Sequence, residues 1–174
     1  MYLNRHGYLV ATVVVASLSV ACNAPIVASA QPPGFPDLSR FTETTQTDLK
    51  QTTRSGGHSA LFRTPDGLVC KLDSAVGECR GSQSVRIPGY PADAPFWPPG
   101  GAQQCLIDTV VYDSDSPGKF RTESMCDDYP YHLLPAGEKI TIGTGVCAIG
   151  NDGLTACTNG THGFVIQASG TQTF

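Results

Sequence analysis

The spacing of the cysteines constrains the fold of this chain more than any other feature of its sequence. Six cysteines follow residue 30, in three successive pairs with gaps of 9, 21 and 10 residues. Their positions are Cys70, Cys79, Cys105, Cys126, Cys147 and Cys157. An even number of cysteines in an exported domain of this size is typical of a disulfide framework. No Cys-x-x-Cys pair occurs, so the spacing does not favour a zinc site.

Six cysteines allow many pairings, and a local argument selects among them. The Asn151-Asp152-Gly153 segment is typical of a tight turn, because its residues tolerate positive φ. It lies midway between two cysteines, which would then face each other across a hairpin. A less definite loop separates the first two cysteines. We therefore predict the nearest-neighbour set: Cys70–Cys79, Cys105–Cys126 and Cys147–Cys157.

The first 30 residues have the layout of a secretory signal peptide. Arg5 precedes an apolar stretch over residues 8–21, and Ala28-Ser29-Ala30 supplies a small-residue cleavage site before Gln31. A rival cut exists, because residues 18–22 resemble a bacterial lipobox that would make Cys22 a lipid-bearing N-terminus. Ser19 stands where that motif usually has leucine, so we favour release. We expect a secreted, extracellular protein, with a lipoprotein anchored on the cell surface as the alternative.

The charge composition excludes one broad class of function. The chain has 11 lysines and arginines against 15 acidic residues, and only 15% of its residues are charged. Nucleic-acid binding needs a basic surface, so a DNA or RNA partner is excluded. No apolar run after the leader approaches the roughly 20 residues that span a bilayer, so we expect no transmembrane span in the mature chain.

The mature chain divides into a stalk and one domain. Residues 31–57 are rich in proline, threonine and glutamine and poor in aliphatic side chains, which predicts a flexible stalk. Residues 58–174 carry short β-branched runs separated by turn residues. We therefore expect a monomeric, mainly β domain, a small antiparallel β-sandwich or barrel with three disulfides. The expected strands cover residues 68–72, 84–87, 104–112, 119–125, 139–142, 146–149, 154–158 and 162–167.

Two segments that begin with Asp-Gly-Leu are weakly similar to each other. Residues 66–70 and 152–157 both run from Asp-Gly-Leu to a cysteine, but the second has one extra residue. We interpret them as two similar turns rather than as a repeat.

The proline-rich segment 88–101 holds the only tryptophan and is the candidate ligand contact. Proline excludes it from a central strand. Tyr90, Phe96 and Trp97 would form a ligand-facing aromatic loop, because rigid aromatic side chains bind at low entropy cost. Alternatively, Phe96 and Trp97 fold back and cap one end of the sheet. We favour this packing interpretation, since a small core needs buried aromatic area.

No catalytic or metal-binding motif is complete. Three histidines follow the leader, His58, His132 and His162. His162 is the most interesting of them as a ligand contact, but we favour a structural role as a hydrogen-bonded residue at a strand start. No Gly-x-Ser-x-Gly motif occurs. The segment from Asp113 to Ser124 begins like a calcium loop but lacks two of its ligands. We expect no catalytic residues, no metal and no cofactor.

Several segments resemble a group of small exported actinobacterial, especially mycobacterial, proteins of unassigned function. The resemblance rests on residues 62–70, 133–137, 147, 153–159 and 162–164, together with the Pro-Pro-Gly-Phe-Pro-Asp-Leu opening of the mature chain. It implies a secreted or lipid-anchored disulfide-linked β domain and no particular activity. The sequence thus predicts a non-catalytic binding module for an unidentified extracellular or cell-envelope ligand. The alternative is an extracellular hydrolase.

Overall fold

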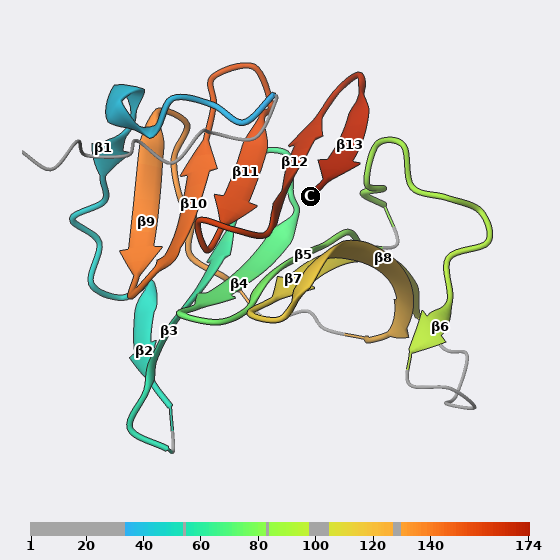
Figure 1. Ribbon diagram of the computed structural model, residues 1–174, viewed down its shortest axis with the longest axis horizontal. Coiled ribbons are helices and arrows are strands. Elements are labelled where there is room, and N and C mark those ends of the chain that lie inside the picture. Colours follow the sequence, from blue (N-terminus) through green and yellow to red (C-terminus); the bar gives the residue numbers. More distant parts are fainter. Residues whose placement is uncertain (1–33, 54, 83, 98–104, 127–129) are drawn as a thin grey trace, which may run out of the picture.

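The computed structural model describes residues 34–53, 55–82, 84–97, 105–126 and 130–174. Its strands form two sheets that pack face to face (Figure 1). The first sheet has six strands in the order β1-β9-β10-β11-β12-β13. They are β1 (Thr42–Glu43), β9 (Glu138–Ile142), β10 (Gly145–Ile149), β11 (Thr155–Thr158), β12 (Gly163–Gln167) and β13 (Gly170–Thr173).

The second sheet has seven strands in the order β2-β3-β4-β5-β7-β8-β6. They are β2 (Lys50–Thr52), β3 (His58–Arg63), β4 (Val69–Asp73), β5 (Gly77–Arg80), β7 (Leu106–Asp113), β8 (Ser116–Ser124) and β6 (Phe96–Trp97). The long β7–β8 hairpin is strongly bent and carries the short edge strand β6 (Figure 1).

The architecture confirms the mainly β prediction in its sandwich form. Both sheets end in edge strands and do not close into a barrel. Two edge pairs, β1 with β9 and β6 with β8, are parallel, so the sheets are mixed rather than purely antiparallel. The strand expected over residues 84–87 is absent, because Ser82 Oγ accepts the backbone N–H groups of Ser84 and Val85 and holds a turn there.

The inner faces of the two sheets share one core, and two disulfides lie inside it. Cys70 and Cys79 are directly opposite in β4 and β5, and Cys147 and Cys157 are directly opposite in β10 and β11. In each pair the Cα atoms are 4.1 Å apart and both side chains are fully buried. The third disulfide, Cys105–Cys126, joins the ends of the β7–β8 hairpin outside this core. All three predicted pairings are therefore confirmed.

The two Asp-Gly-Leu segments do form similar turns. Thr64 N–H donates to the Leu68 carbonyl at 2.9 Å, and Gly150 N–H donates to the Leu154 carbonyl at 2.7 Å. Gly67 and Gly153 occupy the same place in each turn, with φ of 86° and 76°. Positive φ explains why glycine stands at both positions.

The described residues of the predicted stalk belong to the sandwich. Strands β1 and β2 pair with β9 and β3, so residues 34–53 do not form a separate segment. Leu49 is fully buried in the core, and Phe35 packs on Val165 and Phe174 over the outer face of the six-stranded sheet. The prediction of a flexible stalk relied on the polar composition and is wrong for these residues, because backbone pairing and a few buried apolar side chains hold the segment in the fold.

Candidate binding face on the seven-stranded sheet

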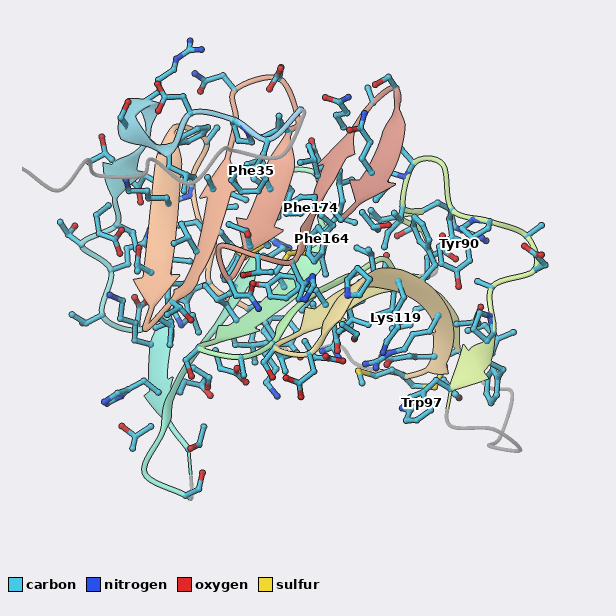
Figure 2. The ribbon with its side chains drawn as sticks, in the orientation of Figure 1. Phe35, Tyr90, Trp97, Lys119, Phe164 and Phe174 are labelled. Atoms are coloured by element: carbon cyan, nitrogen blue, oxygen red, sulfur yellow. A yellow bond between two sulfur atoms is a disulfide. The ribbon has the colours of Figure 1, made fainter. Side chains whose placement is uncertain are left out.

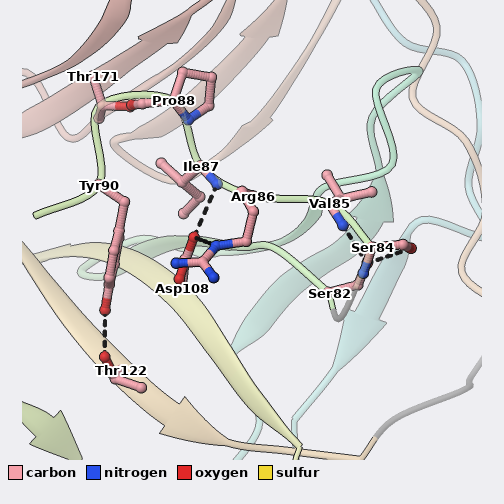
Figure 3. Close-up of polar contacts among 10 residues, drawn as sticks. All are labelled: Ser82, Ser84, Val85, Arg86, Ile87, Pro88, Tyr90, Asp108, Thr122 and Thr171. Carbon is pink, nitrogen blue, oxygen red and sulfur yellow. Dashed lines mark hydrogen bonds and ion pairs between the residues drawn. The ribbon is translucent and has the colours of Figure 1, made fainter. Parts of the chain in front are cut away.

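A buried aspartate anchors the loop that leads to the aromatic residues. Asp108 of β7 is 4% exposed, and its carboxylate forms an ion pair with Arg86 and accepts the Ile87 N–H at 3.2 Å (Figure 3). At the other sheet, Thr171 Oγ1 donates to the Pro88 carbonyl at 2.6 Å. The loop is therefore fixed to both sheets just before Tyr90.

Tyr90 and Phe96 meet the same strand. The hydroxyl groups of Tyr90 and Thr122 share a 2.6 Å hydrogen bond (Figure 3), and the Tyr90 ring packs edge-on against Phe120 at 5.7 Å. Phe96 is paired with Thr122 in the β6–β8 register and is half-buried. Both side chains thus lie on the inner side of β8. The packing interpretation predicts this for Phe96 but did not include Tyr90.

Trp97 does not follow that interpretation. Successive side chains of a strand point to opposite faces, so Trp97, paired with Glu123, lies on the outer face. Its side chain is 52% exposed, and Figure 2 shows Tyr90 and Trp97 on opposite sides of the β8 ribbon. The expectation that Trp97 caps the sheet end is therefore wrong, and the ligand-facing alternative gains its main support from this residue.

Trp97 stands beside a network of charged side chains on the outer face. The Arg121 guanidinium lies 5.9 Å from the centre of the Trp97 ring. Arg121 also donates to Glu78 Oε2 at 2.7 Å and forms an ion pair with Glu123. Strand β7 lies between β5 and β8 and contributes Thr109, whose buried hydroxyl has no hydrogen-bond partner among the described residues. The network fixes Arg121 against one side of the indole ring.

A pocket of about 400 Å³ continues the same face beyond β7. Its lining includes Val69 of β4, Arg80 of β5, Ile107 of β7, and Tyr131. Arg80 donates to the Tyr131 hydroxyl at 3.0 Å. We call the outer surface of β4, β5, β7, β8 and β6, with this pocket, the open face, because no described helix or strand packs on it (Figure 1).

The surroundings of Glu78 raise the pKa of its carboxyl. Burial raises the pKa of this carboxyl above its ordinary value near 4.5, and the negative charge of Glu123 raises it further. Arg121 opposes both effects without cancelling them. A raised pKa means that folding disfavours the charged form of Glu78.

This shift predicts a pH dependence of stability. Because the folded protein holds the Glu78 proton more tightly than the unfolded chain, the contribution of Glu78 falls as pH rises from the ordinary glutamate pKa through the raised value. We expect wild type to gain stability relative to Glu78→Gln as pH is lowered from 7 to about 4.5. Denaturant unfolding of both proteins across this range measures the difference. A difference that is flat, or that changes in the opposite direction, would contradict the assignment.

The other predicted site residues lie elsewhere. His162 is in the turn before β12, where its N–H donates to Asn159 Oδ1 at 2.8 Å and its carbonyl accepts from Thr158 Oγ1 at 2.9 Å. It thus sits at a strand start in the other sheet, and no described contact joins it to the aromatic loop. Cys22 and the whole leader lie outside the described residues, so their processing stays a prediction.

The histidine and acidic candidates do not assemble a metal or catalytic site in the described part of the chain. His132 Nδ1 lies 2.9 Å from Asp48 Oδ2, but both side chains are more than half exposed and no serine hydrogen-bonds to His132 there. Asp113 accepts from Asp115 N–H and pairs with Lys119 in the β7–β8 turn. The described residues contain no group of three or more potential metal ligands.

Sequence reasoning missed the charged half of the open face. Glu78 of β5 is far in the sequence from Arg121 and Glu123 of β8, and no motif joins the two strands. Alternation was the available signal, because Arg121 and Glu123 are two residues apart in a predicted strand and therefore share one face.

No known protein family, curated protein or solved structure matches this chain. No helix among the described residues is long and apolar enough to cross a membrane.

Proposed function

We propose that this chain is exported and acts outside the cell as a non-catalytic binding module whose ligand docks on the open face at Trp97. The observation that carries the proposal is a half-exposed tryptophan, fixed by Arg121, on a sheet face that no described element covers. Exposure of an aromatic side chain of this size to water is unfavourable, and tryptophan is enriched at binding sites. Three disulfides are consistent with an extracellular location.

The described structure fits either mode of export in the proposal. Phe35 and Leu38 already pack against the six-stranded sheet, and Thr42–Glu43 pairs with its strand β9. If signal peptidase cuts before Gln31, the domain is released almost without a tail. If Cys22 carries lipid instead, only residues 23–33 separate the anchor from the sandwich, and the module works at the membrane surface.

A sedimentation experiment tests the proposal. Mature protein is mixed with the insoluble envelope fraction of the cells that produce it, and the bound fraction is measured against concentration. We expect Trp97→Ala to weaken binding at least tenfold, since truncation of a central tryptophan typically costs about 2 kcal/mol or more. Leu133→Ala is the matched control, because Leu133 is 42% exposed at a different edge. Equal binding by wild type and Trp97→Ala would contradict the proposal.

The second candidate, an extracellular hydrolase, draws on the His132–Asp48 pair. A histidine held by an aspartate is two parts of a nucleophile-activating triad. The pair is solvent-exposed and no serine among the described residues hydrogen-bonds to His132, so the hydrolase has less support than the binding module. Ester or peptide hydrolysis that disappears in His132→Ala would favour the hydrolase.

A further inference from the structure

We infer that the ligand of the open face is an uncharged glycan chain that lies across the strands from the pocket at Arg80 to Trp97. This inference rests on the proposed function and names its ligand class. Three properties of the face support it: its charge balance, the separation of its apolar groups, and its length.

The charge balance favours a neutral partner. Alternation places four basic and three acidic side chains on the face: Lys71 and Asp73 of β4, Glu78 and Arg80 of β5, and Lys119, Arg121 and Glu123 of β8. Lys119 pairs with Asp113 at the end of the hairpin, so the two signs balance. Arg121 pairs with Glu78 and Glu123, and Arg80 donates to Tyr131. A charged ligand would have to compete with these contacts, whereas hydroxyl groups can donate to the remaining carboxylate lone pairs and accept from the guanidinium groups.

The apolar groups are separated, as suits a sugar rather than a lipid. Large exposed apolar side chains among the described residues are Trp97, Leu106 and Leu133. Leu106 pairs with Ser124, one residue beyond Glu123, and therefore points to the opposite face from Trp97. A lipid surface needs a continuous apolar patch. A single exposed indole surrounded by hydrogen-bonding groups instead matches a sugar ring, which has an apolar C–H face and polar edges.

A peptide is disfavoured by the strand edge. Peptides that bind sheets usually add a strand to a free edge and gain main-chain hydrogen bonds. At Trp97 the described edge strand β6 is only two residues long, Phe96–Trp97, and pairs in parallel with β8. It offers too few free backbone groups for strand addition.

The length of the face favours a chain over a single sugar. Arg80 of β5, which lines the pocket, and Trp97 of β6 are separated by the strands β7 and β8. Neighbouring strands are about 4.8 Å apart, so the distance from β5 to β6 is roughly 14 Å, which exceeds one sugar ring. A glycan of several residues can contact both ends.

Selective treatment of the envelope fraction tests the ligand class. Separate samples are digested with protease, extracted with organic solvent, or oxidised with periodate, which cleaves the vicinal diols of sugars. We expect wild-type sedimentation to survive the first two treatments and to fall at least tenfold after periodate. Loss of binding after protease would identify a protein ligand, and loss after solvent extraction a lipid. Either result, or binding that resists periodate, overturns the glycan inference.

Two variants test the geometry. Trp97→Phe should retain most binding to the untreated fraction while Trp97→Ala loses it, because a sugar stacks on any aromatic ring. Arg80→Met, with its melting temperature measured in parallel, should weaken binding of long soluble envelope glycan fragments severalfold but leave single-sugar binding unchanged. Equal effects on both lengths would contradict a chain that spans the face. Absence of any Trp97-dependent envelope binding would reject the proposed function itself, whereas periodate resistance with Trp97 dependence rejects only the glycan.

Discussion

Removing one buried disulfide, in the double variant Cys147→Ala/Cys157→Ala, should lower the free energy of unfolding by about 4 kcal/mol. A cross-link across 10 residues restricts the unfolded chain by about 2.7 kcal/mol. The two sulfur atoms also fill space in the shared core, where both cysteines have no exposed surface. Their loss adds roughly 1 kcal/mol or more of packing energy. The melting temperature should fall by roughly 10–20 °C, measured by calorimetry.

The variant Cys105→Ala/Cys126→Ala is the matched comparison. Its loop of 21 residues is longer, so chain entropy alone would make its loss worse by about 0.7 kcal/mol. This disulfide lies outside the core, however, and Cys126 is exposed. Burial should therefore decide the order, with the smaller loss, about 3 kcal/mol, for this pair. A larger loss here than in Cys147→Ala/Cys157→Ala would show that packing of the buried disulfides contributes little.

Arg121→Ala should cost about 3 kcal/mol of stability at neutral pH. The side chains of Glu78 and Glu123 are only 14% and 9% exposed, and both lose their pairing cation in this variant. Leaving a buried charge without its partner is strongly destabilising. Because the pKa of Glu78 is already raised, this carboxyl can be protonated as pH falls, and the cost should shrink towards pH 4.5. Denaturant unfolding at the two pH values measures both effects.

Two further variants make the Arg121 result specific. Lys119→Ala removes a neighbouring cation of β8, but its ion pair with Asp113 is exposed on both sides, so we expect a change within about 0.5 kcal/mol. Adding Glu78→Gln to Arg121→Ala removes one of the two carboxylates that have lost Arg121, and it should recover part of the lost stability. If Arg121→Ala and Lys119→Ala lower the free energy of unfolding equally, the network on the open face contributes no more to stability than a surface ion pair.

Local chemistry made the disulfide pairing predictable. The Asn151-Asp152-Gly153 turn brings its flanking strands into register, and Cys147 and Cys157 then stand opposite each other. The runs of β-branched and apolar residues likewise predicted most strands after Gly67, because alternation reports a buried face.

Non-local pairing limited the rest of the prediction. The exposure of Trp97 depends on β6 joining β8 in parallel, with Trp97 opposite Glu123, and nothing near Trp97 in the sequence encodes that partner. Residues 84–87 have strand-like composition, but Asp108 takes the Ile87 N–H and holds a loop instead. Strands β1 and β2 were missed because their side chains are polar and exposed, and their order comes from backbone pairing.

Export with three disulfides is the claim on which the fold and the proposed function both depend. The most direct test is the intact mass of the protein purified from its native cells, before and after reduction, with the N-terminus read by peptide fragmentation. We predict a chain that begins at Gln31 and gains six hydrogens on reduction, one for each of the bonded cysteines. A lipid-bearing Cys22 with the same mass gain would place the module on the cell surface. An uncleaved leader with no mass change on reduction would contradict export and the disulfide-linked sandwich together.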